Sequence, residues 1–150
     1  MGTTPKIILR KMTPKDLPAV HAIETDSFLI PLSINHYLKC LQSEENLGII
    51  AQVDKKIAGY TMLKFSGEIA TVMIFTIAPE FRGRGIGKKF FWLILSVAKY
   101  NGGKIIKLHV RANNLPAIHV YKSCGLKLAE RLKNFYALIH EDAFLMERQI

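Results

Sequence analysis

The sequence predicts an α/β protein in which helices pack on one mixed, mostly antiparallel β-sheet. Two short turns, Asp54-Lys55-Lys56 and Ser66-Gly67, separate three strand-like segments and favour an antiparallel meander. Later, a helix-like segment leads directly into a strand at Lys104–Val110, which predicts a parallel crossover. Of the 150 residues, 49% are hydrophobic and 22% charged, as in a globular domain with its own core. We therefore expect a single domain over residues 1–150.

The first half of the chain carries clear helix-start signals. Thr13 can cap a helix whose first position suits Pro14, and Ser33 can cap a second helix. Pro31 interrupts the helical pattern between them. The elements expected here are a strand at Lys6–Lys11, a helix from Pro14 to about Phe28, a helix at Ile34–Leu41, and strands at Asn46–Val53, Ile57–Phe65 and Glu68–Ala78.

In the second half, Pro and Gly residues mark the ends of elements. Pro79 ends the meander, and Asn101-Gly102-Gly103 stops a strongly apolar helix. Gly125 suits the C-cap of the next helix. The elements expected here are a helix from about Gly85 to Tyr100, a strand at Lys104–Val110, a helix at Asn114–Cys124, and strands at Leu126–Leu132 and Asp142–Glu147. The total is about seven strands and four helices.

Charge and hydropathy limit the classes of partner. The 21 Lys and Arg residues against 12 Asp and Glu residues give a net charge of +9, which favours phosphates, acidic surfaces or nucleic acid and also suits a solvated surface. The longest apolar run, Phe90–Ala98, is far shorter than the roughly 18–20 residues of a membrane span. Cations interrupt Met1–Lys11, so it lacks a signal-peptide core. We expect a cytoplasmic protein that does not bind membranes.

The two cysteines, Cys40 and Cys124, have no metal-ligand spacing. We expect buried free thiols in a reducing compartment, with a disulfide or a nucleophilic thiol as alternatives. We expect no metal site.

A glycine-rich stretch, FRGRGIGKKF at Phe81–Phe90, lies between a strand end and a helix start. Free N–H groups and the helix dipole attract anions there, and glycine lets the backbone approach a phosphate. The stretch therefore predicts a phosphate or pyrophosphate site. The dinucleotide fingerprint fails because Lys88 replaces its third glycine, and the P-loop fails because Lys89 follows Gly87-Lys88.

The spacing R-x-x-G-x-G from Arg82 to Gly87 resembles the coenzyme A pyrophosphate loop of the GNAT superfamily, the GCN5-related N-acetyltransferases. KLHVRANNLPAIHVYKSCG, at Lys107–Gly125, is similar to a block of its ribosomal-protein and peptide N-terminal acetyltransferases. Two further segments resemble the substrate loop and the ending of that branch: Phe28–Tyr37, and Lys133–Tyr136 with Glu141–Met146. The resemblance runs from about Ile8 to Met146.

The resemblance implies the GNAT fold and acetyl transfer from acetyl-coenzyme A to the N-terminal α-amine of a protein or peptide. It also implies a role for each matching residue. The pyrophosphate would bind the N–H groups of Arg82, Gly83, Arg84, Gly85, Ile86, Gly87 and Lys88. The pantetheine arm would meet backbone groups of Phe75 and Ile77, with Asn114 beside it or capping its helix, and Tyr121 at the sulfur. The peptide pocket would consist of Ile30, Pro31, Leu32, Ile34 and Met73, covered by Phe135 and Tyr136.

The chemistry of the reaction fits a direct attack in a ternary complex. An α-amine has a pKa of about 8, so a nearby base need only complete its deprotonation. Backbone donors would stabilise the oxyanion, and a tyrosine hydroxyl can protonate the departing thiolate. Tyr121 lies seven residues after Asn114, on the same helix face, and is the expected acid. The alternative is a core tyrosine.

His109 is the expected base. On its strand it lies opposite the apolar face formed by Leu108 and Val110, and a histidine is a suitable base near neutral pH. Much of the acetyltransferase group has Glu here, but eukaryotic enzymes that prefer Met-started peptides have L-H-V, as this chain does. The sequence departs from them at Thr71, where they have a catalytic tyrosine, and at Phe135, which replaces their first tyrosine. The base is therefore His109, a water or another group. The alternative for His109 is a histidine that only hydrogen-bonds a neighbouring strand.

Two other functions compete with this hypothesis. Acetylation of a small amine or a lysine side chain keeps the fold, but the apolar loop Phe28–Ser33 favours an apolar, Met-like first residue. A nucleic-acid or ribosome-binding module needs cations in a stripe with exposed aromatics. Here cations surround glycines, and Phe90-Phe91-Trp92 suits a core helix. We expect no sequence-specific nucleic-acid binding, while ribosome docking beside catalysis is compatible with the charge.

Overall fold

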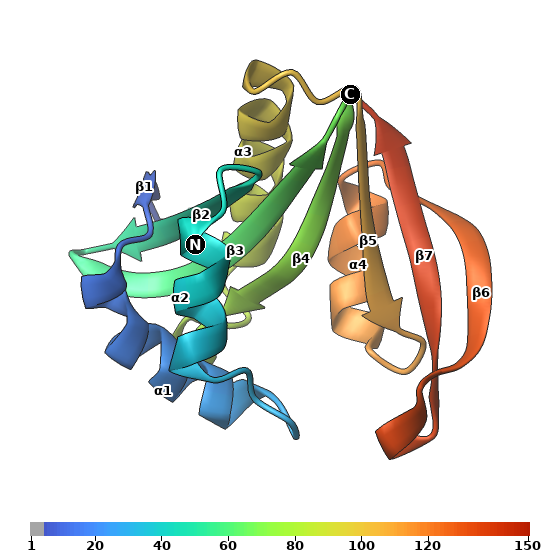
Figure 1. Cartoon of the computed structure of the whole chain (residues 1–150), viewed down its shortest axis with the longest axis horizontal. Helices are drawn as coiled ribbons and strands as arrows, with labels where there is room; N and C mark the ends of the chain where they lie inside the picture. The colour runs from blue at the N-terminus through green and yellow to red at the C-terminus, as the bar shows by residue number, and fades with distance from the viewer. Residues whose placement is uncertain (1–4) are drawn as a thin grey trace.

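The computed structural model describes residues 5–150, so residues 1–4, the beginning of the Met1–Lys11 segment considered above, lie outside it. Seven strands, four α-helices and three short 3₁₀ helices follow one another along the chain (Figure 1). In order they are β1 (Ile8–Lys11), η1 (Pro14–Asp16), α1 (Leu17–Ser27), α2 (Ile34–Gln42), β2 (Asn46–Val53), β3 (Lys56–Ser66), β4 (Ile69–Ile77), η2 (Pro79–Phe81), α3 (Ile86–Tyr100), β5 (Ile105–Arg111), α4 (Leu115–Ser123), β6 (Lys127–Tyr136), η3 (Ala137–Ile139) and β7 (Glu141–Gln149). None of the helices formed by residues 5–150 is long and apolar enough to span a bilayer.

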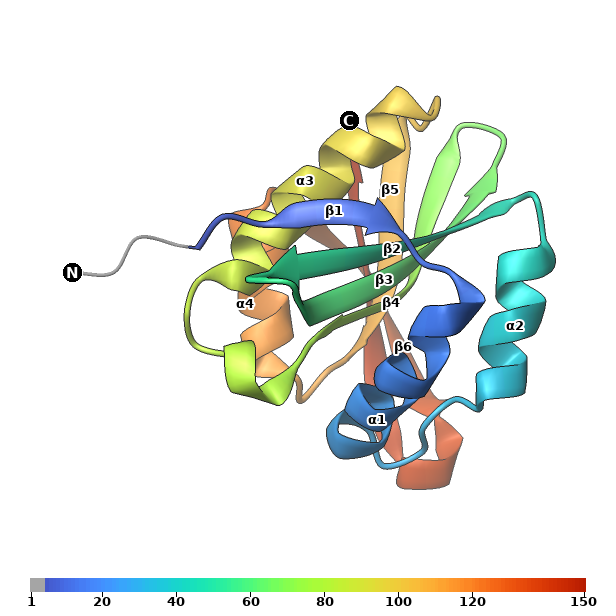
Figure 2. The same ribbon diagram turned by 90° about the vertical axis from the view of Figure 1, so that its left-hand side faces the viewer.

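All seven strands form one sheet in the order β1-β2-β3-β4-β5-β7-β6. The β4–β5 pair is parallel and the other pairs are antiparallel, which confirms the predicted meander and the crossover through α3. Helices α1 and α2 cover one face, and α3 and α4 cover the other (Figure 2). The strand side chains alternate between two cores accordingly: Ile50 packs with α1 and α2, whereas Ile49 packs with α3.

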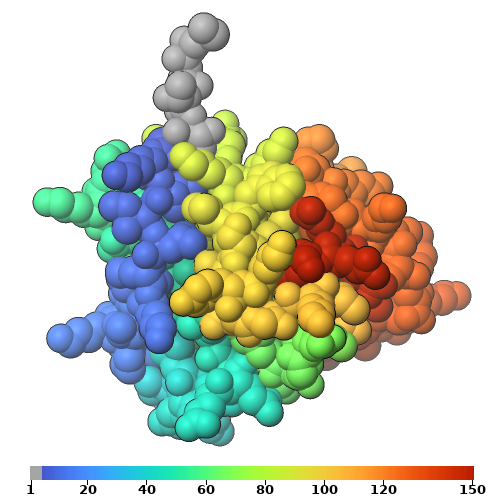
Figure 3. Space-filling model, turned by 90° about the horizontal axis from the view of Figure 1, so that it is seen from above, coloured from blue at the N-terminus to red at the C-terminus, as the bar shows by residue number. Residues whose placement is uncertain are grey.

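The core beneath α3 confirms most of the predicted apolar helix. Phe90, Phe91 and Ile94 are completely buried, at the spacing of one helix face. Trp92 was expected in this core, and that prediction is wrong: its side chain is 43% exposed. The guanidinium of Arg148 on β7 lies 5.2 Å from its ring centroid, an arrangement that suits a cation–π contact. Figure 3 shows α3 in yellow with the red C-terminal strand against it.

Several element boundaries differ from the sequence-based expectation. Strand β6 continues to Tyr136 rather than Leu132, because its pairing with β7 resumes at Tyr136↔Glu141 after irregularities at Leu128/Glu130 and Leu132/Tyr136. Its mostly polar, exposed side chains give no alternating pattern to detect. Cys124 is buried as expected, whereas Cys40 is only half-buried, and both thiols are free. Burial raises the pKa of both thiols.

Strands β4 and β5 pair only from Ile69↔Ile105 to Val72↔Leu108. Immediately afterwards β4 carries an irregularity opposite β3, where Met62 pairs with Ile74 and Leu63 with Val72, so that Met73 is the extra residue. A bulge of this kind bends a strand and locally increases its twist. The two strands therefore separate beyond Val72, which creates the space for the site described below (Figure 1).

The start of α1 depends on an acidic side chain that is almost buried. Both carboxylate oxygens of Asp16 accept hydrogen bonds from Arg10 on β1, at 2.7 and 2.8 Å, and one also accepts from the N–H of Thr13 at 2.8 Å. The Arg10 hydrogen bonds, opposed by burial, lower the pKa of Asp16. This carboxylate joins the first strand to the first helix.

Asp16→Asn is expected to lower the free energy of unfolding at pH 7 by about 1–3 kcal/mol, because Arg10 and Thr13 lose a charged acceptor. The folded-state pKa of Asp16 lies below its unfolded value, so its contribution is present above about pH 4 and disappears as the pH falls through the folded-state pKa. Urea unfolding at pH 7 and pH 3 measures both effects. Asp26→Asn, which alters an exposed carboxylate on α1, is the matched control. An equal loss of stability in both variants would contradict the role of Asp16.

Candidate active site

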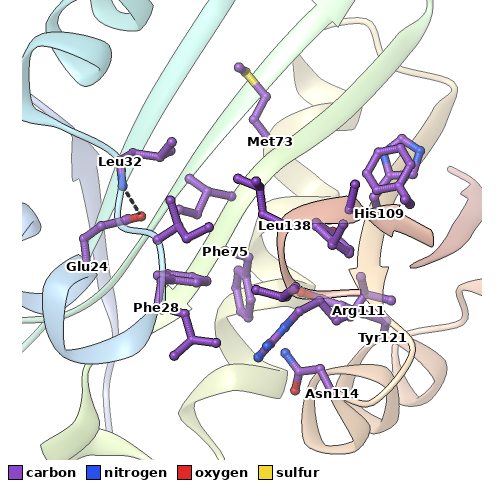
Figure 4. A pocket seen from close by; sticks show the side chains of 18 residues that line it. Glu24, Phe28, Leu32, Met73, Phe75, His109, Arg111, Asn114, Tyr121 and Leu138 are labelled. Carbon is purple, nitrogen blue, oxygen red and sulfur yellow. Dashed lines mark hydrogen bonds between the residues drawn. The ribbon is translucent and has the colours of Figure 1, made fainter. Parts of the chain in front are cut away.

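A pocket of about 600 Å³ opens where β4 and β5 separate. Its walls come from four parts of the chain: the segment after α1, the middle of β4, the end of β5 with the start of α4, and the β6–β7 connection (Figure 4). The lining residues are Glu24, Phe28, Leu29, Ile30, Leu32, Met73, Ile74, Phe75, His109, Val110, Arg111, Asn114, Tyr121, Phe135, Tyr136, Ala137, Leu138 and Ile139. The fold therefore brings together most of the residues predicted for catalysis and peptide binding.

The glycine loop before α3 has the backbone expected of an anion site. Gly83 and Gly85 adopt φ of 73° and 76°, in the left-handed region that other residues rarely enter. Within residues 5–150, no acceptor pairs with the N–H groups of residues 83–88, which surround the start of a 15-residue helix. These donors and the positive helix end attract an anion. The loop does not line the pocket itself.

The side chain of Arg82 forms hydrogen bonds within the protein. Its Nε donates to the carbonyl of Ile77 at 3.0 Å, and its Nη2 donates to Oγ of Ser27 at 2.9 Å. Its main-chain N–H donates to the carbonyl of Pro79 at 3.3 Å. Arg82 thus ties the end of α1 to the end of β4, and the donors left for an anion begin at Gly83.

The start of α4 contributes a second helix end to the site. The side-chain oxygen of Asn114 accepts from the N–H of Ala117 at 3.3 Å, so Asn114 caps its helix, one of the two roles considered for it. Asn114 and Tyr121 both line the pocket, as their shared helix face predicts. Helices α3 and α4 pack closely here: a Cβ at Gly87 would lie 3.6 Å from Ile77 and 3.8 Å from Val120.

Tyr121 is part of the core and also reaches the pocket. Only 6% of the residue is exposed, and its ring packs against Phe91 and Phe75, with centroids 5.1 and 6.1 Å away. Burial, with a smaller effect of Tyr136, raises the pKa of Tyr121 far above its ordinary value near 10. The hydroxyl therefore carries its proton at neutral pH and is a potential donor.

His109 lies at the rim of the pocket with its imidazole exposed. Its ring stacks on Phe135 with centroids 4.7 Å apart and an interplanar angle of 17°. No residue between 5 and 150 forms a hydrogen bond with the imidazole, so the histidine is not bonded to a neighbouring strand. Phe135 thus orients the ring by stacking, without using either ring nitrogen.

Residues 17–126 match the family model described as Acetyltransferase (GNAT) family. The chain belongs to the GNAT family of acetyltransferases. This confirms the resemblance and the predicted GNAT fold, and it makes the chain an N-acetyltransferase of a family that uses acetyl-coenzyme A.

Relatives of this GNAT enzyme include N-acetyltransferases of proteins. A [ribosomal protein bS18]-alanine N-acetyltransferase of Salmonella typhimurium is 30% identical over 133 residues, covering 87% of this chain and 89% of that protein. The crystal structure of the ribosomal-protein-S18-alanine N-acetyltransferase of Escherichia coli matches with a TM-score of 0.88 and 25% identity, covering 97% and 94%. NAA60 of Arabidopsis thaliana, crystallised with a bisubstrate analogue, matches with a TM-score of 0.80 and 25% identity, covering 97% and 98%.

The GNAT enzyme has separate places suited to the two ends of acetyl-coenzyme A. The free N–H groups at residues 83–88 suit a pyrophosphate, and the space beside the unpaired part of β4 suits an extended arm. The carbonyl of Ile77, however, already accepts from Arg82. Among residues 5–150, no group of three or more His, Cys, Asp or Glu could hold a metal ion.

The residues predicted for peptide binding in this GNAT enzyme divide into two groups. Ile30, Leu32, Met73, Phe135 and Tyr136 line the pocket, and Met73 is 43% exposed in its wall. Pro31 and Ile34 do not line it. Pro31 is exposed, and Ile34 packs into the core beneath α1 and α2.

Two charged residues of the GNAT pocket were missed by sequence analysis. Arg111 is the last residue of β5, and its Nη1 lies 3.7 Å from Oε1 of Glu141. Glu24 is only 1% exposed and lines the opposite part of the pocket. The helical spacing could have identified Glu24, because it shares the buried face of α1 with Leu17 and Val20. A carboxylate is rarely buried without a binding partner.

Proposed function

We propose that this enzyme transfers an acetyl group from acetyl-coenzyme A to the N-terminal α-amine of a protein or peptide. The observation that supports it is a pocket lined together by a protonated, buried tyrosine, an exposed histidine and an apolar loop. Ribosomal protein bS18 is the substrate in the name of the Salmonella typhimurium relative. The net charge of +9 also suits docking near the ribosome, whose nucleic acid is anionic.

The cofactor would bind across two sites. The N–H groups of Gly83, Arg84, Gly85, Ile86, Gly87 and Lys88 would hold the pyrophosphate, and Arg82 would fix the loop from behind. Beside the separated strands, Phe75 would face the pantetheine arm, and Asn114 would cap the adjacent helix. Acetyl-coenzyme A, when bound, supplies an activated thioester carbonyl.

Two side chains would move protons. His109 would accept a proton from the substrate ammonium, directly or through a water, because its ring nitrogens form no hydrogen bonds within residues 5–150. Thr71, whose hydroxyl is no base near neutral pH, occupies the position of the tyrosine found in related enzymes. Tyr121 would donate a proton to the departing thiolate, since its raised pKa keeps the phenol protonated. His109 on β5 and Tyr121 on α4 line the same pocket, so both would reach the reacting groups of a ternary complex.

The acceptor's first side chain would be apolar. Phe28, Ile30, Leu32 and Met73 form a mainly hydrocarbon wall, which suits a side chain such as that of Met. Phe135 and Tyr136 would cover the peptide backbone, and His109 lies beside Phe135.

A peptide that starts with Met-Leu is expected to be acetylated at least about tenfold more efficiently, in kcat/KM, than free lysine or spermidine. The apolar wall gains free energy from burying the Met side chain, about 2 kcal/mol for full burial, and gains nothing from a charged amine. A panel of N-terminal peptides and small amines with acetyl-coenzyme A measures this ratio. A peptide with a blocked N-terminus and one internal lysine is the control, and faster acetylation of that peptide would overturn the proposal.

Gly85→Ala is expected to weaken acetyl-coenzyme A binding about tenfold. A Cβ in left-handed backbone costs about 1–2 kcal/mol, so the loop would relax away from its anion-binding shape. Isothermal titration calorimetry measures the dissociation constant. Gly67→Ala creates the same kind of strain in the β3–β4 turn, at φ of 58°, and should leave binding unchanged. Equal affinity in the wild type and Gly85→Ala would contradict the assignment of this loop.

His109→Ala is expected to lower kcat about 100-fold, the usual loss on removing a general base, while the KM for acetyl-coenzyme A stays within twofold. Steady-state kinetics with a Met-Leu peptide test this. His119→Ala, which removes an exposed histidine from α4, should leave both constants unchanged. Wild-type kcat in His109→Ala would assign the proton transfer to a water instead.

A further inference from the structure

A carboxylate is buried in the wall of the pocket without a cationic partner among residues 5–150. Glu24 on α1 is 1% exposed, and none of the ion pairs formed by those residues includes it. A buried carboxylate is costly unless hydrogen bonds replace its hydration. A carboxylate in this position therefore needs a structural or chemical role.

Three donors satisfy Glu24. Oε1 accepts from the hydroxyls of Tyr37 on α2 and Tyr60 on β3, at 2.6 and 2.7 Å. Oε2 accepts from the main-chain N–H of Leu32 at 3.0 Å (Figure 4). Burial, with a smaller contribution from Glu24, raises the pKa of both phenols well above 10, so both carry the protons they donate.

The hydrogen bond from the Leu32 N–H to Glu24 holds a segment that lines the pocket. Leu29, Ile30 and Leu32 lie between the end of α1 at Ser27 and the start of α2 at Ile34, outside any helix or strand. Leu29 and Ile30 are 78% and 58% exposed, so packing holds them weakly. Of the stretch Leu29–Leu32, it is Leu32 whose N–H forms a hydrogen bond within residues 5–150. Glu24 therefore fastens the segment to α2 and β3.

The geometry argues against Glu24 as the base. Both of its oxygens already accept hydrogen bonds from protein donors. Figure 4 shows Glu24 on the side of the pocket opposite His109 and Tyr121, with its oxygen directed at Leu32. An acceptor that already receives three hydrogen bonds and faces away from the groups proposed to transfer protons suits positioning rather than proton transfer.

We propose that Glu24 is a positioning residue that holds Leu29–Leu32 in place as the wall that recognises the first side chain of the acceptor. This inference rests on the proposed function, because it assigns a role within peptide binding. Its consequence is that the affinity for the peptide and the preference for Met over smaller first residues depend on three hydrogen bonds behind the wall. Binding of acetyl-coenzyme A, at the other end of β4, does not depend on them.

The test compares two substitutions of equal length. Glu24→Met fills the same space but accepts no hydrogen bonds. Glu24→Gln retains one strong acceptor for Leu32 N–H, while its NH₂ group can donate to the tyrosine oxygens, which also accept. We expect Glu24→Met to raise the peptide KM at least tenfold and to reduce the Met-over-Ala preference at least fivefold. Glu24→Gln should restore both to within about threefold of wild type.

Three controls separate positioning from other roles. The dissociation constant for acetyl-coenzyme A should stay within twofold in both variants. Asp26→Asn, on the exposed side of α1, should change nothing. Amide hydrogen exchange at Leu32 should be at least tenfold faster in Glu24→Met than in wild type. If Glu24→Met does not fold, the wild type still provides a test, since Leu32 must exchange more slowly than Ile30.

Each contrary outcome has a distinct meaning. Loss of activity in Glu24→Gln equal to that in Glu24→Met would overturn positioning in favour of a role for the negative charge. A lower kcat with an unchanged peptide KM would overturn it in favour of proton transfer. If the amide of Leu32 exchanged as fast as that of Ile30 in the wild type, the hydrogen bond from Leu32 to Glu24 would not hold the segment, and the proposal would be wrong. A wild-type enzyme that acetylates no peptide would instead overturn the proposed function, while Leu32 exchange would still report on the anchor.

Discussion

The separation of β4 from β5 is the constraint on which the site depends. The parallel pairing of β4 with β5 lasts from Ile69↔Ile105 to Val72↔Leu108, and the irregularity at Met73 then turns β4 away. A closed sheet would satisfy its backbone internally and leave no space for two substrates. The open part instead exposes strand edges to the pocket, where a ligand can complete the hydrogen bonding. Helices α3 and α4, packed through Gly87, hold the two halves of the sheet in this arrangement.

The pocket has a buried part beside Tyr121 and a solvent-exposed part beside His109. Tyr121 is nearly buried among aromatic rings, and burial raises its pKa, which favours a proton donor. His109 is exposed at the rim, where water would remove a proton accepted in the proposed reaction. Stacking on Phe135 orients the imidazole without a hydrogen bond. The two side chains thus receive opposite environments from one fold, which suits the acid and base roles that we propose for them.

Much of this was predictable because the signals are local. Pro14, Ser33 and Asn114 mark helix starts, the glycine spacing from Gly83 to Gly87 predicts a tight turn before a helix, and alternation on β5 separates His109 from the apolar face. Predictions that depended on contacts between residues far apart in the sequence were wrong in two places. Trp92 was placed in the core although Arg148 stacks on it at the surface, and β6 was ended early because its pairing with β7, rather than its own pattern, sustains it.

Local sequence was therefore enough for the family, the order of the elements and most of the residues that line the pocket, since each rests on spacings within one element or one turn. The tertiary structure alone decides how they cooperate. It commits the Arg82 guanidinium to Ser27 and Ile77 instead of a ligand, and it places Phe135 over His109. It also gathers two tyrosines and a loop amide around Glu24. The physical reason is that desolvation and hydrogen-bond saturation are properties of residues far apart in the chain that become neighbours only in the fold.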